Sequence, residues 1–209
     1  RHSSETIPFI WSKTMIVISE ELKKIKKDLK KELDKNRYQH TLGVMYTASC
    51  LAMRYSGDIQ QAMLAGLLHD CAKCIPAERQ IHLCEKNRIP MRDVELKNPH
   101  LLHAKLGALL AKSQYGIKDK TVLHAIEAHT TGMPNMGLLD KIIFVADYIE
   151  PHRDKAPDLA EVRKLAFDDI NEAVLRILYD TIHYLDQRRG AVDPVTYDTY
   201  EFYRKLLNR

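Results

Sequence analysis

AMLAGLLHD, residues 62–70, is an apolar run of helical length that ends on a histidine followed by an aspartate. Further imidazole and carboxylate side chains occur along the chain at His40, His103, His129 and Asp147. Neutral imidazole and carboxylate together suit iron, manganese, cobalt, nickel or zinc, whereas magnesium prefers a shell of oxygen atoms. If helices bring these residues together, the sequence predicts a transition-metal site.

The composition indicates one folded domain with a modest charge. The chain has 209 residues, of which 45% are hydrophobic and 29% charged, and its formal net charge is +4. These values exclude an intrinsically disordered chain, and no apolar run reaches the roughly 18 residues that a membrane helix needs. Most of the excess positive charge lies between Lys23 and Lys35 without interleaved aromatic residues, which is typical of a solvated helix face. We therefore expect no nucleic-acid partner and no membrane partner.

The N-terminus lacks the features of a secretion signal. Residues 1–14 contain no long apolar segment and no small-residue cleavage site, whereas Met15 precedes the start of a helical pattern. We expect residues 1–14 to be a disordered N-terminus or an addition ahead of the native start, and residues 15–209 to form a single domain. The four cysteines, with no export signal, indicate reduced thiols and a cytoplasmic protein.

The sequence predicts one helix after another and no convincing strand. Serine or aspartate caps, prolines in first turns and glycines after last turns mark the expected helix ends. The fold class is therefore all-α, and the candidate ligands lie on the ends or inner faces of different helices. The expected helices are one capped by Ser19, then 37–55, one from Asp58 to His69, 76–86, 98–116, 119–129, 138–149, 159–189 and one that starts at Asp193-Pro194.

The candidate ligands gain weight as a set, since a single histidine on an apolar helix is more often a packing or surface residue. Asp70 directly follows a histidine at a helix end, so that both could meet one ion or the carboxylate could bridge two. Asp147 interrupts the apolar segment 142–146, where an unpaired carboxylate would be costly to bury. His100 and His103 are three residues apart, and this spacing does not show which of them points inward.

The arrangement of His40, the pair His69-Asp70 and Asp147 resembles the H…HD…D signature of the HD-domain metal-dependent phosphohydrolases. The surrounding segments are more specific, because five of them, in order, resemble the YqeK family of bacterial symmetrical diadenosine-tetraphosphate hydrolases. The similarity extends over roughly residues 22–207. The five segments are RYQHTLGV (37–44), LLHDCAK (67–73), LLHA (101–104), HTTG (129–132) and ADYIEP (146–151).

The resemblance implies a single HD domain, a helical bundle with a two-metal site between its helices. It favours iron as the metal, with manganese or cobalt as alternatives. His103 is preferred to His100 as a ligand because it stands in the segment LLHA. The implied ligands are His40, His69, Asp70 and Asp147 for one ion, and Asp70 as a bridge, His103 and His129 for the other.

Three positions depart from the usual pattern of the family. Cys71 and Cys74 surround Lys73, where other residue types are more typical, and Ala104 follows the histidine where glycine is common. The two cysteines form a CxxC motif, which elsewhere marks a redox pair or half of a zinc site. No second CxxC motif and no βαβ pattern accompany it, so we expect these cysteines to be small side chains beside the metal site.

These groups indicate hydrolysis of a phosphoanhydride. Two metal ions would lower the pKa of a water that bridges them and give hydroxide near neutral pH. A nucleoside polyphosphate is strongly anionic, so cationic side chains should line the pocket, and the threonines after His129 could donate hydrogen bonds to phosphate or cap the turn. The residues expected to contact substrate are Arg37, Lys73, Thr130, Thr131 and Arg153, with Asp70, Lys73 and Arg153 serving catalysis.

The cleavage position rests on the resemblance alone, which implies diadenosine tetraphosphate, a dinucleoside polyphosphate, as substrate and two ADP molecules as products. Loops near residues 75–90 and 131–137 are expected to contact adenosine. Two alternatives stay open at this point. One is another HD phosphohydrolase, acting on a nucleoside monophosphate, a dNTP or an alarmone, and the other is a non-catalytic nucleotide-sensing HD module. A homodimer also stays open.

Overall fold

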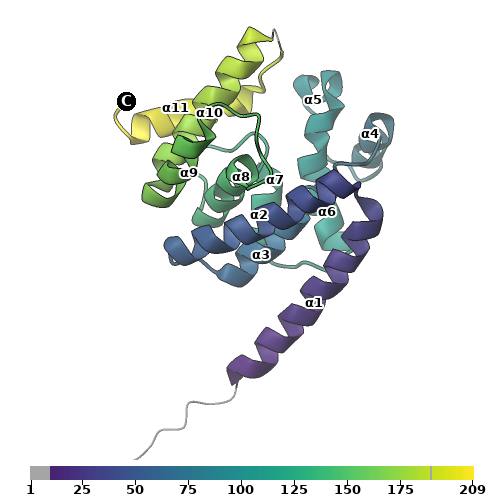
Figure 1. The fold of residues 1–209 in the computed structure, drawn as a ribbon. Helices are drawn as coiled ribbons and strands as arrows, with labels where there is room; N and C mark the ends of the chain where they lie inside the picture. The colour runs from purple at the N-terminus through teal and green to yellow at the C-terminus, as the bar shows by residue number, and fades with distance from the viewer. Residues whose placement is uncertain (1–9, 189) are drawn as a thin grey trace, which may run out of the picture.

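The structure is a computed structural model that describes residues 10–188 and 190–209, and within these ranges it contains helices and no strand. This confirms the all-α prediction. Helix α8 lies near the centre, in contact with α2, α3, α7, α9 and α10, while the first half of α1 extends away from the body (Figure 1). The helices are α1 (Ile10–Glu32), α2 (Lys35–Arg54), α3 (Ile59–Leu68), α4 (Ala77–Lys86), α5 (Asp93–Lys97), the 3₁₀ helix η1 (Pro99–Leu102), α6 (His103–Ser113), α7 (Lys120–Ala128), α8 (Leu138–Ile149), α9 (Leu159–Asp168), α10 (Ile170–Gln187) and α11 (Pro194–Leu206).

Aspartate side chains cap the N-termini of several helices. Asp58 accepts hydrogen bonds from the backbone N–H groups of Gln60 and Gln61, and Asp119 accepts them from Thr121 and Val122. Each such cap satisfies backbone donors that have no partner within the first turn of a helix. The same arrangement begins α2 at Asp34, α10 at Asp169 and α11 at Asp193.

Three of the expected helix boundaries were wrong. The first helix begins at Ile10, so Ser19 lies inside it; no proline or glycine interrupts this stretch. Part of the segment 1–14, residues 1–9, lies outside the described residues. The expected helix 159–189 is two helices, because Asp169 takes an extended conformation (φ −143°, ψ 110°) and caps the second of them.

The third wrong boundary lies next to the candidate ligands. The expected helix 98–116 is a 3₁₀ turn, η1, followed by α6, and the short helix α5 precedes it. Asn98 leaves the helical conformation, with φ −135° and ψ 73°, as expected of a residue before a proline. As a result, His103 is the first residue of α6 rather than a residue in the middle of a longer helix.

Close packing of α2 against α3 fixes the position of His40 on α2 relative to His69, which follows α3. A Cβ atom at Gly66 would lie 2.9 Å from Cα and 3.2 Å from N of Met45, so the two helices can approach this closely only with glycine at that position. Met45 on α2 and Leu67 and Leu68 on α3 are fully buried in the core. The close approach places the residues after Leu68 beside the first turns of α2.

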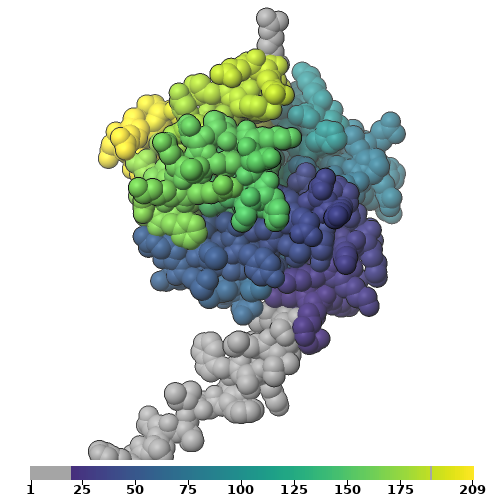
Figure 2. Space-filling model, viewed as in Figure 1, coloured from purple at the N-terminus to yellow at the C-terminus, as the bar shows by residue number. Residues whose placement is uncertain are grey.

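Segments far apart in the sequence lie against each other around the core. Tyr55 donates a hydrogen bond from its Oη to the carbonyl of Ala166 at 2.8 Å, and Arg54 Nε donates to the carbonyl of Phe167 at 2.6 Å. The space-filling view shows the blue segment of α2 directly against the green segment of the chain that follows α8 (Figure 2). Among the described residues, none of the helices combines the length and apolarity that crossing a membrane requires.

Candidate metal centre

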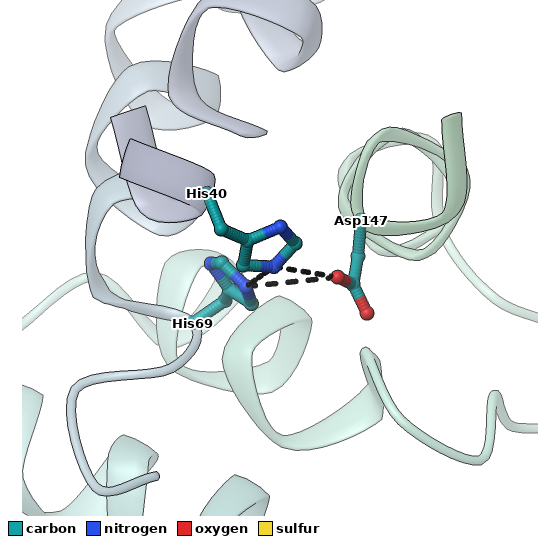
Figure 3. Close-up of side chains that lie close together, drawn as sticks. All are labelled: His40, His69 and Asp147. Atoms are coloured by element: carbon teal, nitrogen blue, oxygen red, sulfur yellow. Dashed lines mark hydrogen bonds and ion pairs between the residues drawn. The ribbon is translucent and has the colours of Figure 1, made fainter. Parts of the chain in front are cut away.

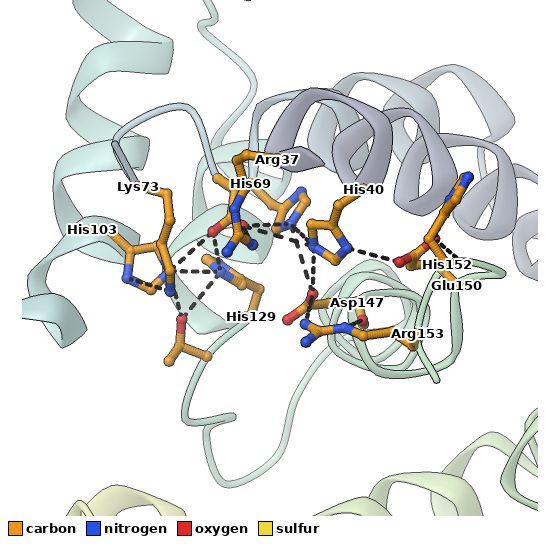
Figure 4. Close-up of polar contacts among 12 residues, drawn as sticks. Arg37, His40, His69, Lys73, His103, His129, Asp147, Glu150, His152 and Arg153 are labelled. Carbon is orange, nitrogen blue, oxygen red and sulfur yellow. Dashed lines mark hydrogen bonds and ion pairs between the residues drawn. The ribbon is translucent and has the colours of Figure 1, made fainter. Parts of the chain in front are cut away.

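The six predicted ligands converge from five places in the fold. Figure 4 shows the side chains meeting between the helices, with His103 and His129 at one end and His40 and Asp147 at the other. Five of the six side chains belong to buried residues, and the side chain of Asp147 is 21% exposed. Their sources are α2 for His40, the turn after α3 for His69 and Asp70, the start of α6 for His103, the residue after α7 for His129, and α8 for Asp147.

The first cluster consists of His40, His69 and Asp147, whose ligand atoms lie within 4.8 Å of one another. The Nε2 atom of His40 is 3.0 Å from Oδ1 of Asp147 and 3.4 Å from Nε2 of His69. The Nε2 atom of His69 is 3.9 Å from the same carboxylate oxygen. The two rings and the carboxylate therefore face one small volume between α2, α3 and α8 (Figure 3).

The second cluster lies around the carboxylate of Asp70. Its Oδ1 atom is 3.2 Å from Nε2 of His103 and 3.6 Å from Nε2 of His129. Its Oδ2 atom is 3.5 Å from Nε2 of His69 and 3.8 Å from Nε2 of His40. One carboxylate thus presents one oxygen to each pair of imidazoles, which is the arrangement of a bridging ligand.

Three of the four imidazoles donate a hydrogen bond from Nδ1 to a backbone carbonyl, which leaves Nε2 free to bind a metal. Nδ1 of His69 donates to the carbonyl of Gly66 at 2.7 Å, Nδ1 of His129 to that of Ile126 at 2.6 Å, and Nδ1 of His103 to that of His100 at 2.5 Å. A neutral ring that donates through Nδ1 carries a lone pair on Nε2, and this outer hydrogen bond fixes the tautomer.

The lone pairs of the inward-facing nitrogens can be met by the Thr130 hydroxyl, by Lys73 or by a cation between the two rings. Nε2 of His103 and Nε2 of His129 are 3.1 Å apart, and two lone pairs at that distance cannot form a hydrogen bond with each other. A proton or a metal ion can satisfy both atoms together with the carboxylate. The donor set, its burial and its tautomers fit divalent transition metals.

Electrostatics keep His103 and the two carboxylates in the states that bind metal. Burial lowers the pKa of His103 to about 4, so the ring is neutral at pH 7. Burial alone would raise the pKa of Asp70, but the neighbouring imidazoles of His69, His103 and His129 hold it well below its usual range. The pKa of Asp147 is likewise well below its usual range, because the hydrogen bond with His40 and the charges of Arg153 and the neighbouring imidazoles together outweigh the effect of burial. Both carboxyl groups are anions at neutral pH.

Three predicted cationic residues lie at the edge of the two clusters. Arg37 Nη1 donates to Oδ2 of Asp70 at 2.6 Å, and Arg153 Nη2 donates to Oδ1 of Asp147 at 2.8 Å. Nζ of Lys73 is 3.2 Å from Nε2 of His103. Burial lowers the pKa of Lys73. Each of these cations therefore lies within hydrogen-bond distance of a candidate metal ligand.

The two predicted threonines are placed differently. Oγ1 of Thr130 is 3.1 Å from Nε2 of His129 and 3.2 Å from Nε2 of His103, so this hydroxyl belongs to the second cluster. Oγ1 of Thr131 donates to the carbonyl of Gly132 at 3.0 Å and lines a neighbouring cavity instead. The structure thus brings Thr130 to the candidate ligands and does not bring Thr131 there.

That cavity has a volume of about 560 Å³ and begins beside the second cluster, where Thr130 belongs to both. Pro90 comes from the first loop expected to contact adenosine, and Thr131, Met133 and Pro134 come from the second. Its other lining residues are Met91, Arg92, Glu95, Leu101, Ala104, Lys105, Glu127 and Val195. Seven of the thirteen lining residues are apolar and six are polar or charged, so the cavity combines apolar surface with groups that can orient a ligand.

Glu150 is a functional candidate that the sequence analysis did not single out. It is 1% exposed, and its Oε1 is 3.0 Å from Nδ1 of His40, behind the candidate ligand. Its Oε2 accepts hydrogen bonds from the backbone N–H of His152 at 2.8 Å. A carboxylate three residues after Asp147, at the end of an apolar helix, was the available signal.

The CxxC motif contributes no disulfide, since Cys71 and Cys74 are both free thiols. Cys71 is buried, and burial raises the pKa of its thiol to about 12, which keeps the sulfur protonated and unreactive. Cys74 is exposed, with Sγ 3.7 Å from Oδ2 of Asp34. The sulfur atoms therefore do not form a redox pair in this structure.

Comparisons with known proteins agree with this geometry. The HD domain family matches residues 37–152. The chain is 41% identical to the symmetrical bis(5'-nucleosyl)-tetraphosphatase of Bacillus subtilis, over 83% of this chain and 92% of that protein. It is 33% identical to the enzyme of the same name from Staphylococcus aureus, over 87% and 94% of the two chains. A crystal structure from Clostridium acetobutylicum, described as a predicted HD superfamily hydrolase involved in NAD metabolism, is similar with a TM-score of 0.85 and 42% identity, over 88% of this chain and 97% of that one.

Proposed function

Because this chain belongs to the HD-domain family, among the symmetrical bis(5'-nucleosyl)-tetraphosphatases, we propose that it hydrolyses diadenosine tetraphosphate to two molecules of ADP. The reaction adds one water across the central phosphoanhydride bond, so that each product carries two phosphates. The activity named for the relatives supports this substrate over an alarmone or a nucleoside monophosphate. It also supports a hydrolase over a non-catalytic sensor.

The observation that carries the proposal is the position of Asp70 between two sets of imidazoles, with one carboxylate oxygen toward each. Two divalent ions in such a site act as Lewis acids on phosphate and lower the pKa of water. We propose iron as the metal, and the same donor set also suits manganese or cobalt. The proposed ligands are His40, His69, Asp70 and Asp147 for one ion and Asp70, His103 and His129 for the other.

The cations around the clusters are proposed to bind the polyphosphate. Arg37 and Arg153 offer planar guanidinium groups, which suit paired hydrogen bonds to phosphate oxygens, and Lys73 offers a point charge. Thr130 adds a hydroxyl donor at the second cluster. These groups would hold the chain of phosphates across the two clusters and offset the negative charge that grows during cleavage.

One nucleoside is proposed to occupy the cavity beside Thr130. The apolar side chains of Met91, Leu101 and Met133 line this cavity and suit the faces of a purine ring. Lys105 and Glu127 are polar lining residues able to contact the edge of the base or the ribose. Because Thr130 belongs both to the cavity and to the second cluster, phosphates at the clusters would place a nucleoside there.

Product analysis tests the proposed reaction. Protein purified without oxygen, with its metal content measured, is incubated with diadenosine tetraphosphate, and the products are separated by anion-exchange chromatography. We expect ADP as the sole product. AMP together with ATP would overturn the symmetrical cleavage, and the absence of turnover in a protein that holds both ions would overturn the proposed function.

His103 should contribute to one ion only. We expect His103→Ala to lower the metal content from two ions to about one per chain, because only the second cluster loses a ligand. His100→Ala is the matched control, since the side chain of His100 is exposed and only its carbonyl reaches the ring of His103. Metal analysis after gel filtration measures both. Depletion by His100→Ala, with His103→Ala unaffected, would show that the wrong histidine is assigned.

Arg153 should act on substrate rather than on metal content. Charge-assisted hydrogen bonds contribute about 1.5–3 kcal/mol, so we expect Arg153→Ala to lower kcat/KM by about 10- to 100-fold. Metal analysis should still find both ions, because Arg153 is not a proposed ligand and its side chain donates hydrogen bonds to the ligand Asp147. Arg204→Ala removes a partly exposed arginine that pairs with Glu201 and serves as the control. Loss of metal equal to the loss of activity would contradict a substrate role.

A further inference from the structure

The four histidines of the candidate metal centre are not supported in the same way. His69, His103 and His129 each donate Nδ1–H to a backbone carbonyl three residues earlier. His40 instead faces a carboxylate, with its Nδ1 3.0 Å from Oε1 of Glu150. A carboxylate behind a histidine makes the opposite ring nitrogen a stronger donor to metal and fixes its orientation.

The surroundings of Glu150 hold its carboxylate in this position. The residue is 1% exposed, and burying a carboxylate is costly unless partners satisfy both oxygens. Oε1 faces His40, while Oε2 accepts from the backbone N–H of His152 at 2.8 Å and lies 3.0 Å from its Nδ1. Figure 4 shows His40, Glu150 and His152 as a continuous row that leads away from the clusters.

The sequence of α2 also leaves room for this carboxylate. A Cβ atom at Gly43 would collide with Oε2 of Glu150 and would lie 3.1 Å from its Cδ and 3.2 Å from Nδ1 of His152. Gly43 is one helical turn after His40 on the same helix, so its side of α2 faces the same carboxylate. Glycine at this position is explained by the space that Glu150 occupies.

The two clusters differ in whether a buried carboxylate lies behind their imidazole rings. The cluster of His40, His69 and Asp147 has Glu150 behind it. The cluster around His103 has no carboxylate behind its rings among the described residues. Both clusters have a cation beside a ligand, because Arg153 Nη2 lies 2.8 Å from Oδ1 of Asp147 and Lys73 Nζ lies 3.2 Å from Nε2 of His103, so the buried carboxylate of Glu150 is what distinguishes them. A positive charge beside a ligand opposes the binding of a cation, whereas a buried anion behind a ligand favours it.

We propose that Glu150 is a positioning residue that makes the cluster of His40, His69 and Asp147 the tighter of two unequal metal sites. The ion at this cluster binds first and leaves last, and the ion at the cluster of His103 and His129 exchanges more readily. This inference rests on the proposed metal site, but it does not depend on which nucleotide is the substrate.

Metal titration of stripped protein tests the inference. Chelator-treated full-length protein is titrated with Mn²⁺ alone, and calorimetry together with metal analysis gives the number and affinity of the ions. We expect two classes of Mn²⁺ site in the wild-type protein. Glu150→Gln keeps the shape and a hydrogen-bond acceptor but removes the charge, and should weaken the tighter class by about 10- to 100-fold while the weaker class is unchanged.

Two further variants sharpen the comparison. Gly43→Ala retains the charge of Glu150 but displaces its carboxylate, and should weaken the same class of site. Asp180→Asn removes another buried carboxylate, paired with Arg176 on α10, and should change neither class. General destabilisation would affect both classes in every variant, so an effect restricted to the tighter class separates positioning from stability.

The outcomes separate this inference from the proposed function. If Glu150→Gln weakens only the weaker class, or neither, the inference is wrong and the metal site stands. If wild-type protein binds two Mn²⁺ ions of equal affinity, the inference is also wrong. Two unequal Mn²⁺ sites without hydrolysis of diadenosine tetraphosphate would overturn the proposed function alone, and absence of Mn²⁺ binding would overturn both.

Discussion

Asp70→Asn is expected to abolish hydrolysis and to remove both metal ions. The carboxylate faces His103 through Oδ1 at 3.2 Å and His69 through Oδ2 at 3.5 Å, so a neutral amide withdraws the anion from both clusters at once. Loss of one group that stabilises charge in a transition state costs about 10²- to 10³-fold in kcat. Because this variant should lose both ions, we expect kcat to fall by more than about 10³-fold. Steady-state kinetics and metal analysis on the same sample measure the two effects.

The isosteric change keeps the test free of a packing defect. Asparagine fills the volume of the aspartate, and Arg37, which donates to Oδ2 at 2.6 Å, can still donate to the amide oxygen. Asp180→Asn is the matched control, because Asp180 is also buried and also pairs with an arginine. Full turnover by Asp70→Asn, or two ions retained with no loss of kcat, would remove Asp70 from the proposed site.

Three of the six candidate ligands were predictable from local pattern, whereas His40, His103 and His129 were assigned through the family resemblance. Asp147 interrupts a run of apolar residues in α8, and a carboxylate there must have a partner. His69 and Asp70 end the apolar run of α3, where the chain leaves the helix and both side chains can turn to one centre. Conflict between a polar residue and its apolar surroundings is visible in sequence, and it pointed to residues that the structure brings together.

The choice between His100 and His103 could not come from spacing. Residues three apart lie on the same side of a helix, so the pattern treats them as equivalent. In the structure, a 3₁₀ turn ends at Leu102 and α6 begins at His103, which turns the second ring inward and leaves the first exposed. That change of helix type depends on Asn98 and Pro99 and on packing against α4. The periodicity of the sequence does not predict it.

The break between α9 and α10 was hidden for a different reason. Phe167, Asp168 and Asp169 include no glycine or proline, so the helical pattern of residues 159–189 looks continuous. The break appears only because Asp169 takes an extended conformation and caps α10, where its side chain accepts from Asn171 and Glu172. Packing of α10 against both α8 and α9 stabilises this turn, and such long-range contacts are not written in local sequence.

Glu150 was missed because its role requires two elements to meet. It lies 110 residues from His40 in sequence, and only the packing of α2 against α8 brings the two side chains to 3.0 Å. From the sequence, a glutamate before Pro151 could equally have ended a helix in solvent. A residue that supports a ligand, such as Glu150, is therefore harder to predict than the ligand itself. Its partner is one distant side chain, whereas the ligands share a common centre.

Removal of the metal is expected to lower both activity and thermal stability. Ions that bind the folded clusters and not the unfolded chain stabilise the fold by about 2.7 kcal/mol when their concentration is 100 times Kd. For a chain of this length, 1 kcal/mol shifts Tm by about 2–4 °C, so chelation should lower Tm by roughly 5–10 °C. Activity should disappear with the ions and return when iron or manganese is added back. Differential scanning calorimetry and product assays before and after treatment with a chelator measure both effects.

Asp70→Asn is the control for the chelation experiment, because it tests whether the chelator acts through the two clusters. A chelator that acts through the two clusters should leave the Tm of this variant unchanged, because the variant has no ions to lose. The inward-facing Nε2 atoms of His103 and His129, 3.1 Å apart, explain the direction of the change: without a metal they lose the cation they share, and the Thr130 hydroxyl and Lys73 remain as the donors near them. An unchanged Tm and full activity in chelated wild-type protein would mean that hydrogen bonds and packing alone hold the clusters, and the two-metal proposal would fail.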